Sequence, residues 1–173
     1  MLQTLPRSDT PSGAAYVDRG KGEETLVLIH GVGMRIEAWG PQIERLSRDH
    51  RVIAVDLPGH GFSAPLTASP DLSNFVTWFT RLVDGLGLEA VNVAGHSMGA
   101  LIAAGFAVTQ GQRLRRVALL NGVYKRTPAA RQAVKARADE ILSGAFDREA
   151  PLERWFSDDE KDSAPDRQAS TAG

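Results

Sequence analysis

The sequence predicts an α/β fold in which a mostly parallel sheet carries crossover helices. Short runs of apolar, β-branched residues alternate with longer segments whose apolar residues recur at helical spacing. The short runs lack polar alternation, as is typical of strands that are buried on both faces of a parallel sheet. Because helices that join parallel strands form right-handed crossovers, the carboxyl ends of the strands should share one edge of the sheet, where such proteins place their sites.

The elements follow one another in the order that this class requires. We expect strands at 14–18, 25–30, 51–55, 90–94 and 114–120, and helices at 37–46, 71–85, 97–110 and 129–142. Asp71 is a suitable N-cap for the helix with the clearest apolar periodicity, and glycines end that helix. Residues 1–13 are polar, contain Pro6 and Pro11, and are expected to form a loose arm.

The strand at 90–94 leads into Gly95-His96-Ser97-Met98-Gly99 and then into an alanine-rich helix, which is the pattern of a nucleophile elbow. A serine hydroxyl projects beyond a sheet only on a very sharp turn, and the two glycines keep neighbouring side chains out of that turn. The start of the helix points free N–H groups, including that of Met98, toward the site where an oxyanion would form. Ser97 is therefore a candidate nucleophile, and the alternative is that it only caps the helix.

Composition limits the class of function. Lys and Arg total 20 against 21 acidic residues, a net charge of −1, so no overall field attracts nucleic acid or an anionic membrane. The sequence has no cysteine, no secretory signal pattern and no apolar run long enough to cross a bilayer. We therefore expect a cytoplasmic protein that acts on a small-molecule substrate. The histidines lack zinc-site spacing and the glycines after His30 do not complete a dinucleotide-binding motif, so no metal and no cofactor are expected.

Three motifs in this order resemble the α/β-hydrolase superfamily: His30-Gly31-Val32-Gly33, the segment Asp-Leu-Pro-Gly-His-Gly-Phe-Ser at 56–63, and the elbow at 95–99. The resemblance covers the amino-terminal portion and is to the branch of esterases, enol-lactonases, carbon–carbon-bond hydrolases and haloperoxidases. It implies an α/β-hydrolase fold with Ser97 as the nucleophile and the N–H groups of Val32 and Met98 as the oxyanion hole. It also implies that 56–63 is a structural turn beside the pocket, and that the substrate is a small ester, lactone or related carbonyl compound.

The resemblance also implies a catalytic acid and then a histidine, each after a later strand. The sequence has 4 histidines, and none lies beyond the elbow. His30 and His60 are interpreted as hydrogen-bonded scaffolding of their loops. His50 precedes a strand at the opposite end of the sheet, and His96, beside the nucleophile, is expected to pack sideways. The triad acid and histidine are therefore missing, and the chain alone is expected to be nearly inactive.

We divide the chain into the amino-terminal part of the hydrolase core at 1–124, the start of a helical cap at 125–156, and a polar tail at 157–173. The tail has no large apolar side chain and is not expected to form a buried strand. The sequence is thus expected to be truncated after the strand that follows the elbow helix and the start of the cap. In that case Val117–Leu120 becomes an exposed apolar edge, through which the chain would self-associate or bind a complementing chain.

Between residues 111 and 138 all charged residues are basic: Arg113, Arg115, Arg116, Lys125, Arg126, Arg131, Lys135 and Arg137. One interpretation is a solvated face, and the other is a surface that attracts a carboxylate- or phosphate-bearing substrate. Three functions stay open at this point. They are a cofactor-free serine hydrolase, a non-catalytic ligand-binding module on the same scaffold, and one subunit of a two-chain hydrolase.

Overall fold

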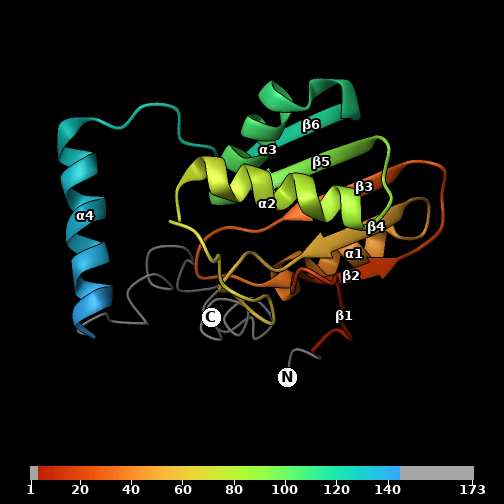
Figure 1. Ribbon diagram of the computed structural model, residues 1–173, viewed down its shortest axis with the longest axis horizontal. Coiled ribbons are helices and arrows are strands. Elements are labelled where there is room, and N and C mark those ends of the chain that lie inside the picture. The colour runs from red at the N-terminus through yellow and green to blue at the C-terminus, as the bar shows by residue number, and fades with distance from the viewer. Residues whose placement is uncertain (1–3, 145–173) are drawn as a thin grey trace, which may run out of the picture.

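The computed structural model describes residues 4–144, in which the strands form one 6-stranded sheet (Figure 1). The strands are β1 (Ser8–Asp9), β2 (Ala15–Arg19), β3 (Thr25–Ile29), β4 (Arg51–Val55), β5 (Val91–His96) and β6 (Leu114–Leu120). Their order across the sheet is β1-β2-β4-β3-β5-β6. β3, β4, β5 and β6 run parallel, whereas β2 is antiparallel to both β1 and β4. This mostly parallel sheet confirms the predicted fold class.

Parallel pairing brings the carboxyl ends of the last four strands to one edge of the sheet. Ile29 at the end of β3 lies opposite Val55 of β4 on one side and Gly95 of β5 on the other. His96 of β5 lies opposite Leu120 of β6. The loops that follow these strands therefore start side by side, and each of the three sequence motifs begins at this edge.

Helices connect the strands at the expected places. They are α1 (Gly40–Leu46), α2 (Leu72–Gly85), α3 (Met98–Thr109) and α4 (Pro128–Ser143), with the 3₁₀ turns η1 (Ile36–Trp39) and η2 (Gly111–Arg113). The Asp71 side chain accepts a hydrogen bond from Asn74 N–H at 2.9 Å, so the predicted N-cap of α2 is confirmed.

The first turn of the helix predicted at 37–46 is a 3₁₀ turn instead of an α-helix. Pro41 has no N–H, so the Glu37 carbonyl cannot receive the bond that an α-helix would give it. That carbonyl accepts a bond from Gly40 N–H instead, which is the shorter 3₁₀ connection. Apolar periodicity did not distinguish the two kinds of turn, because Trp39 and Ile43 are buried in either case.

Helices cover both faces of the sheet, as Figure 1 shows. On one face α2 and α3 pack on the strands, and Phe79 and Phe106 meet edge to face with 5.0 Å between ring centroids. On the other face η1 and α1 pack Ile36, Trp39 and Ile43 against β2, β3 and β4. Burial on both faces is the reason that the strands form continuous apolar runs in the sequence.

The loose arm predicted at 1–13 is wrong for the part that the structure describes, residues 4–13. β1 pairs with β2, and Thr10 is buried and accepts a hydrogen bond from Ala14 N–H at 3.0 Å. The side chain of Arg7 is only 6% exposed and pairs with buried carboxylates. The segment is ordered because Arg7 pairs with Glu37 and Asp56, which are distant in the sequence. The local composition of the segment does not indicate these contacts.

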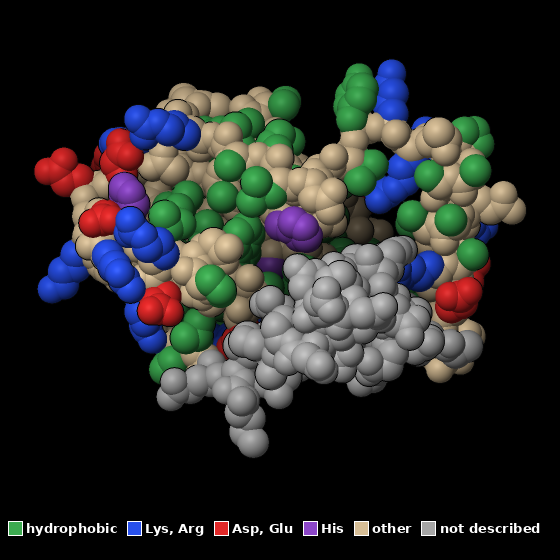
Figure 2. Space-filling view, turned by 180° about the vertical axis from the view of Figure 1, so that it is seen from behind, with side chains coloured by type: hydrophobic (Ala, Val, Ile, Leu, Met, Phe, Trp, Pro, Cys, Tyr) green, Lys and Arg blue, Asp and Glu red, His purple; other side chains and the backbone are tan. Residues whose placement is uncertain are grey.

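β6 and α4 leave most of their side chains exposed. Within the described residues β6 pairs with β5 alone, and Val117, Leu119 and Leu120 are 41%, 50% and 43% exposed. α4 has no buried residue and stands apart from the sheet in Figure 1. Seen from behind in Figure 2, the α4 side of the molecule shows hydrophobic, basic and acidic side chains next to one another.

The segment boundaries expected at 124 and 156 stay predictions. Of the cap segment 125–156, residues 145–156 lie outside the described residues, as does the whole tail at 157–173. No helix in the described range has both the length and the apolar character that spanning a membrane would require.

Candidate active site

Ser97 lies on a sharp turn between β5 and α3, at the carboxyl edge of the sheet. Its φ of 54° is in the left-handed region, where residues other than glycine are uncommon. Its N–H donates to the Leu120 carbonyl at 2.9 Å, and its carbonyl accepts from the N–H groups of Ala100 and Leu101. These bonds fix the backbone on both sides of the turn, and they hold a conformation that would otherwise be unfavourable.

Two glycines allow this turn to close. A Cβ on Gly95 would overlap the Gly99 carbonyl, and a Cβ on Gly99 would overlap the Ile29 carbonyl. The elbow therefore packs backbone against backbone on both α3 and β3. This close approach is the reason that both positions require glycine, as the sequence predicted.

The side chain of Ser97 makes no capping hydrogen bond to α3. Ser97 is the N-cap residue of α3 by position but does not cap the helix through its side chain, and its role as a nucleophile stays a prediction. Within residues 4–144 no side chain hydrogen-bonds to its hydroxyl. The hydroxyl group of a partly buried serine is thus left available at the end of β5.

Two backbone N–H groups beside the elbow, those of Val32 and Met98, donate no hydrogen bond within the described part of the chain. Met98 is the first residue of α3, where N–H groups have no acceptor inside the helix. Val32 lies on the loop after β3, and this loop packs on the elbow, because a Cβ on Gly31 would lie 3.1 Å from Ser97 Cβ. Unpaired donors of this kind can stabilise an oxyanion.

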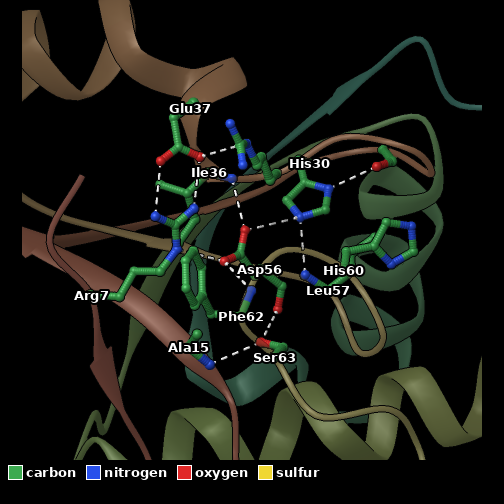
Figure 3. A network of polar contacts seen from close by, with 12 residues as sticks. Arg7, Ala15, His30, Ile36, Glu37, Asp56, Leu57, His60, Phe62 and Ser63 are labelled. Carbon is green, nitrogen blue, oxygen red and sulfur yellow. Dashed lines mark hydrogen bonds and ion pairs between the residues drawn. The ribbon is translucent and has the colours of Figure 1, made fainter. Parts of the chain in front are cut away.

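The loop that carries Val32 begins at His30, whose ring is fully buried (Figure 3). Its Nδ1 lies 2.7 Å from the Gly31 carbonyl, and its Nε2 lies 3.0 Å from Leu57 N. A backbone N–H can only donate, so Nε2 is the acceptor and the ring proton resides on Nδ1, which donates to Gly31. His30 thus joins the loop after β3 to the chain after β4, and its predicted scaffolding role is confirmed.

Burial lowers the pKa of His30 to about 4 from its usual 6.5, although the Gly31 carbonyl and the Asp56 carboxylate oppose the change. The ring is therefore neutral at neutral pH. Only the neutral ring can accept the hydrogen bond from Leu57 N–H. Burial and the hydrogen bond from Leu57 N–H thus both favour the neutral form of the His30 ring.

Asp56 follows β4, and its carboxylate accepts hydrogen bonds from donors in separate segments of the chain, as Figure 3 shows. Its Oδ1 accepts from Ile36 N–H at 2.9 Å, and its Oδ2 accepts from Phe62 N–H at 3.1 Å and from Arg7 Nε at 2.7 Å. Ser63 Oγ closes the turn by donating to the Asp56 carbonyl at 2.7 Å. The prediction that 56–63 is a structural turn is confirmed by these contacts.

Arg7 reaches the same cluster from the amino-terminal segment. Its Nη1 and Nη2 donate to the two carboxylate oxygens of Glu37 at 2.8 and 2.7 Å, and its guanidinium lies 4.7 Å from the centroid of the Phe62 ring. Burial alone would raise the pKa of Glu37, but hydrogen bonds from Arg7 and Leu5 N–H, with the Arg7 charge, lower it below its usual value. Sequence analysis missed both residues, because neither belongs to a local motif.

The other histidines also make no bond to the Ser97 hydroxyl. His60 Nδ1 lies 3.1 Å from the Pro58 carbonyl, which confirms its scaffolding role, and His50 is exposed just before β4, at the opposite edge of the sheet. His96 lines a pocket on the α1 side, and partial burial lowers its pKa. All 4 histidines of the sequence are among the described residues, and none of them hydrogen-bonds to the Ser97 hydroxyl there, so the absence of a triad histidine stays a prediction.

The pocket beside the elbow has a volume of about 200 Å³. It lies between the loop after β3, α1 and the ends of β5 and β6, and its lining residues are His30, Met34, Ala38, Trp39, Gln42, His96 and Leu120. The Nε1 of Trp39 is buried without a hydrogen-bond partner. Within residues 4–144, no group of three or more His, Asp and Glu side chains is arranged to hold a metal ion.

Seven of the eight basic residues of 111–138 fall into two groups in the structure, and the eighth, Arg137, has a contact of its own. Those around the start of β6 are paired: Arg113 with Asp84, and Arg115 and Arg116 with Glu24. This end of β6 is opposite the Ser97 edge. After the carboxyl end of β6 come Lys125, Arg126, Arg131 and Lys135, none of which pairs with an acid inside the described range. Among residues 4–144, the segment that leaves the Ser97 edge thus carries four basic side chains that form no ion pair, and Asp139 and Glu140 follow them on α4.

The chain is similar to known hydrolases. A family model described as alpha/beta hydrolase fold matches residues 24–151. The (E)-2-((N-methylformamido)methylene)succinate hydrolase of Acinetobacter baylyi is 52% identical over 147 residues, which are 85% of this chain and 56% of that protein. The 2-hydroxy-6-oxononadienedioate/2-hydroxy-6-oxononatrienedioate hydrolase 2 of Pseudomonas putida is 35% identical over 112 residues, or 62% of this chain and 39% of that protein.

Among solved structures, the enol-lactonase from Burkholderia xenovorans LB400 is 28% identical, with a TM-score of 0.76 over 96% of this chain and 67% of that one. The chain thus spans about half, or less, of the length of the two hydrolases named above, at 56% and 39%.

The elbow glycines provide a first prediction. Gly95→Ala should lower the free energy of unfolding by about 1–3 kcal/mol or more, because its Cβ meets backbone that cannot move aside. Gly85→Ala is the matched control, since a Cβ there meets nothing within 4 Å at the end of α2, and it should change stability by less than about 1 kcal/mol. Urea unfolding measures both. Equal stabilities of the two variants would contradict the packing described here.

The buried ring of His30 provides a second prediction. Its pKa is lower in the folded chain, so its contribution to stability is complete above about pH 6.5 and is lost as pH falls toward 4. A shift of this size corresponds to about 3 kcal/mol at most. The free energy of unfolding should fall between about pH 6.5 and 5, where carboxylates stay largely ionised. His30→Gln, which cannot be protonated, should show a smaller fall, and an equal fall in both proteins would show that another group titrates.

Proposed function

The chain belongs to the α/β-hydrolase family, and from that premise we propose that it carries the nucleophile and the oxyanion hole of a serine hydrolase. Ser97 is the nucleophile, and the N–H groups of Val32 and Met98 bind the oxyanion. The observation that carries this proposal is the elbow itself. It presents Ser97 at φ 54° between β5 and α3, with a side chain that makes no cap hydrogen bond. Beside it lie two backbone N–H groups that donate no hydrogen bond within residues 4–144.

In this mechanism Ser97 Oγ attacks the carbonyl carbon of the substrate while a base takes the hydroxyl proton. The π electrons of the carbonyl move onto its oxygen, where the two N–H groups donate. The tetrahedral intermediate then expels the leaving group, which receives the proton. Water releases the acyl group from Ser97 by the same steps, so water is the only second substrate.

Among residues 4–144 no histidine hydrogen-bonds to Ser97 Oγ as a proton acceptor. His30 and His60 are engaged with backbone groups, His50 lies at the other edge of the sheet, and His96 lines the pocket on the α1 side. Loss of the base lowers turnover in triad enzymes by about 10⁶. We therefore propose that the isolated chain is nearly inactive and that an imidazole supplied from outside it would restore part of the reaction.

The substrate class follows from two relatives and from the charge pattern. Both hydrolases are named for molecules with two carboxylates, a succinate and a dioate. Here Lys125, Arg126, Arg131 and Lys135 form no ion pair with an acid among residues 4–144, whereas Arg113, Arg115 and Arg116 around the start of β6 do. We propose a small carbonyl compound that carries carboxylates, with an ester, lactone or amide as the bond that is cleaved. This favours the anion-attracting interpretation of Lys125, Arg126, Arg131 and Lys135.

The exposed edge of β6 supports a second proposal, about partners. Its unpaired backbone groups and its exposed apolar residues Val117, Leu119 and Leu120 form a surface to which another strand can pair. We propose that this edge binds a second copy of the chain or a complementing chain. A complementing chain is also the natural source of the missing base.

A fluorophosphonate reacts only with an activated serine, so it tests the assignment of Ser97. The purified 173-residue chain should show almost no adduct by intact mass. Added imidazole should increase the rate of adduct formation roughly tenfold or more, because it can take the hydroxyl proton. Ser97→Ala should form no adduct in either condition.

The same assay tests the substrate class. Succinate should slow the imidazole-dependent reaction, and its uncharged dimethyl ester should not. A folded chain that forms no adduct even with imidazole would contradict the assignment of the nucleophile. Binding of succinate without any adduct would instead favour a non-catalytic ligand-binding module.

The β6 edge predicts that the mass of the protein in solution rises with concentration. Leu119→Lys should shift the equilibrium toward monomer, because a charge on an edge strand opposes pairing. Val108→Lys is the matched control, since Val108 is 87% exposed but lies on α3, in the groove that α3 forms with α2. Sedimentation equilibrium measures all three proteins. A wild-type chain that stays monomeric at every concentration would contradict self-association.

A further inference from the structure

The position of Val32 depends on a loop that has little structure of its own. Between β3 and η1 the chain makes one turn, closed by a bond of 3.3 Å from Met34 N–H to the Gly31 carbonyl. Val32 is 62% exposed, and a Cβ on Gly33 would meet nothing within 4 Å. The loop therefore cannot hold the Val32 N–H toward Ser97 by packing around its tip. Its two ends have to be fixed instead.

Both ends of this loop are fixed to the same place, the start of the chain after β4 (Figure 3). At the first end His30 accepts a hydrogen bond from Leu57 N–H. At the second end Ile36 N–H donates to Asp56 Oδ1 at 2.9 Å. Two adjacent residues, Asp56 and Leu57, thus determine where the loop begins and where it ends.

The Asp56 carboxylate has to stay charged and fixed in order to do this. Its side chain is fully buried, and so is most of Glu37, at 0% and 2% exposure. Arg7 is the group that pairs with both carboxylates, through Nε to Asp56 and through Nη1 and Nη2 to Glu37. Buried charges of one sign need such a partner, because they have lost the solvation that water gave them.

Arg7 is not part of the loop between β3 and η1. It belongs to the amino-terminal segment beside β1, and 30 residues separate it from Glu37 in the sequence. Arg35, inside the loop, also approaches Glu37 at 3.3 Å but does not contact Asp56. Among the described residues Arg7 is thus the cation that bridges the second end of the loop to the chain after β4.

We propose that Arg7 is a positioning residue for the oxyanion hole: by bridging Glu37 and Asp56 it fixes the loop that points Val32 N–H at Ser97. Arg7 does not touch the substrate in this proposal. It acts through Asp56, whose carboxylate holds Ile36 N–H on one side and Phe62 N–H on the other. The positional part stands on these contacts alone, whereas its effect on catalysis rests on the proposed function.

Amide hydrogen exchange on the full chain tests the positional part directly. In Arg7→Met, the N–H groups of Ile36 and Phe62 should exchange about tenfold faster or more, because the carboxylate that accepts from them loses its partner. Val93 N–H in the centre of β5 is the internal reference, and its exchange should change much less. Arg7→Lys, which keeps the charge, should lie between wild type and Arg7→Met.

Arg51→Met is the matched control. Arg51 also donates through Nε and Nη2 to one carboxylate, that of Asp18, but at the other end of β4. It should leave the exchange of Ile36 and Phe62 at the wild-type rate. If Arg7→Met does not fold, Glu37→Gln, which keeps the shape and removes the charge, should show the same local increase in weaker form.

The possible results distinguish the positioning role of Arg7 from the proposed function of Ser97. A folded Arg7→Met chain in which Ile36 exchanges as in wild type, or in which Val93 accelerates equally, would overturn the positioning role. The rate of imidazole-dependent labelling at Ser97 should also fall about tenfold in Arg7→Met and not in Arg51→Met. If wild type is never labelled, the proposed function fails, and the exchange measurement still decides the role of Arg7.

Discussion

The buried Asp56 carboxylate is the constraint on which the edge of the sheet beside Ser97 depends. A full negative charge without solvent is stable only when donors and a counter-charge surround it, and loss of the partner from such a pair costs about 3–5 kcal/mol. The donors come from Ile36, Phe62 and Arg7, which belong to three different segments. Satisfying one side chain therefore requires the amino-terminal segment, the loop after β3 and the turn after β4 to meet at one point.

The proposed oxyanion hole forms between two parts that are fixed by different physical means. The elbow is fixed by steric contact, since Gly95 and Gly99 bring backbone against backbone and no side chain intervenes. The loop after β3 is fixed by polar contacts at its two ends, through His30 and Ile36. The two parts meet at Gly31, where a Cβ would lie 3.1 Å from Ser97 Cβ. A shift in either part would change the distance between the Val32 and Met98 N–H groups.

Sequence patterns were sufficient to predict the structural elements that depend on residues close together in the chain. The strands from β2 on, the Asp71 cap and the elbow glycines follow from periodicity or from local steric rules, and the structure contains them. The ordered segment at 4–13 could not be predicted in this way, because its order comes from the contacts of Arg7 with residues 30 and 49 positions away. The 3₁₀ turn at η1 was within reach, since Pro41 is visible in the sequence and removes the α-helical bond to Glu37.

Charge balance connects the buried cluster to the chemistry at Ser97. Arg7 and Arg35 offset the carboxylates of Glu37 and Asp56, so the cluster has no net charge at neutral pH while His30 stays neutral. Without that balance two buried negative charges would lie behind the loop of the proposed oxyanion hole, in surroundings where Coulomb interactions are weakly screened. The same balance matters before the reaction, when a substrate with carboxylates approaches. Under the proposed function, Lys125, Arg126, Arg131 and Lys135 attract the substrate only if the cluster beneath the loop does not repel it.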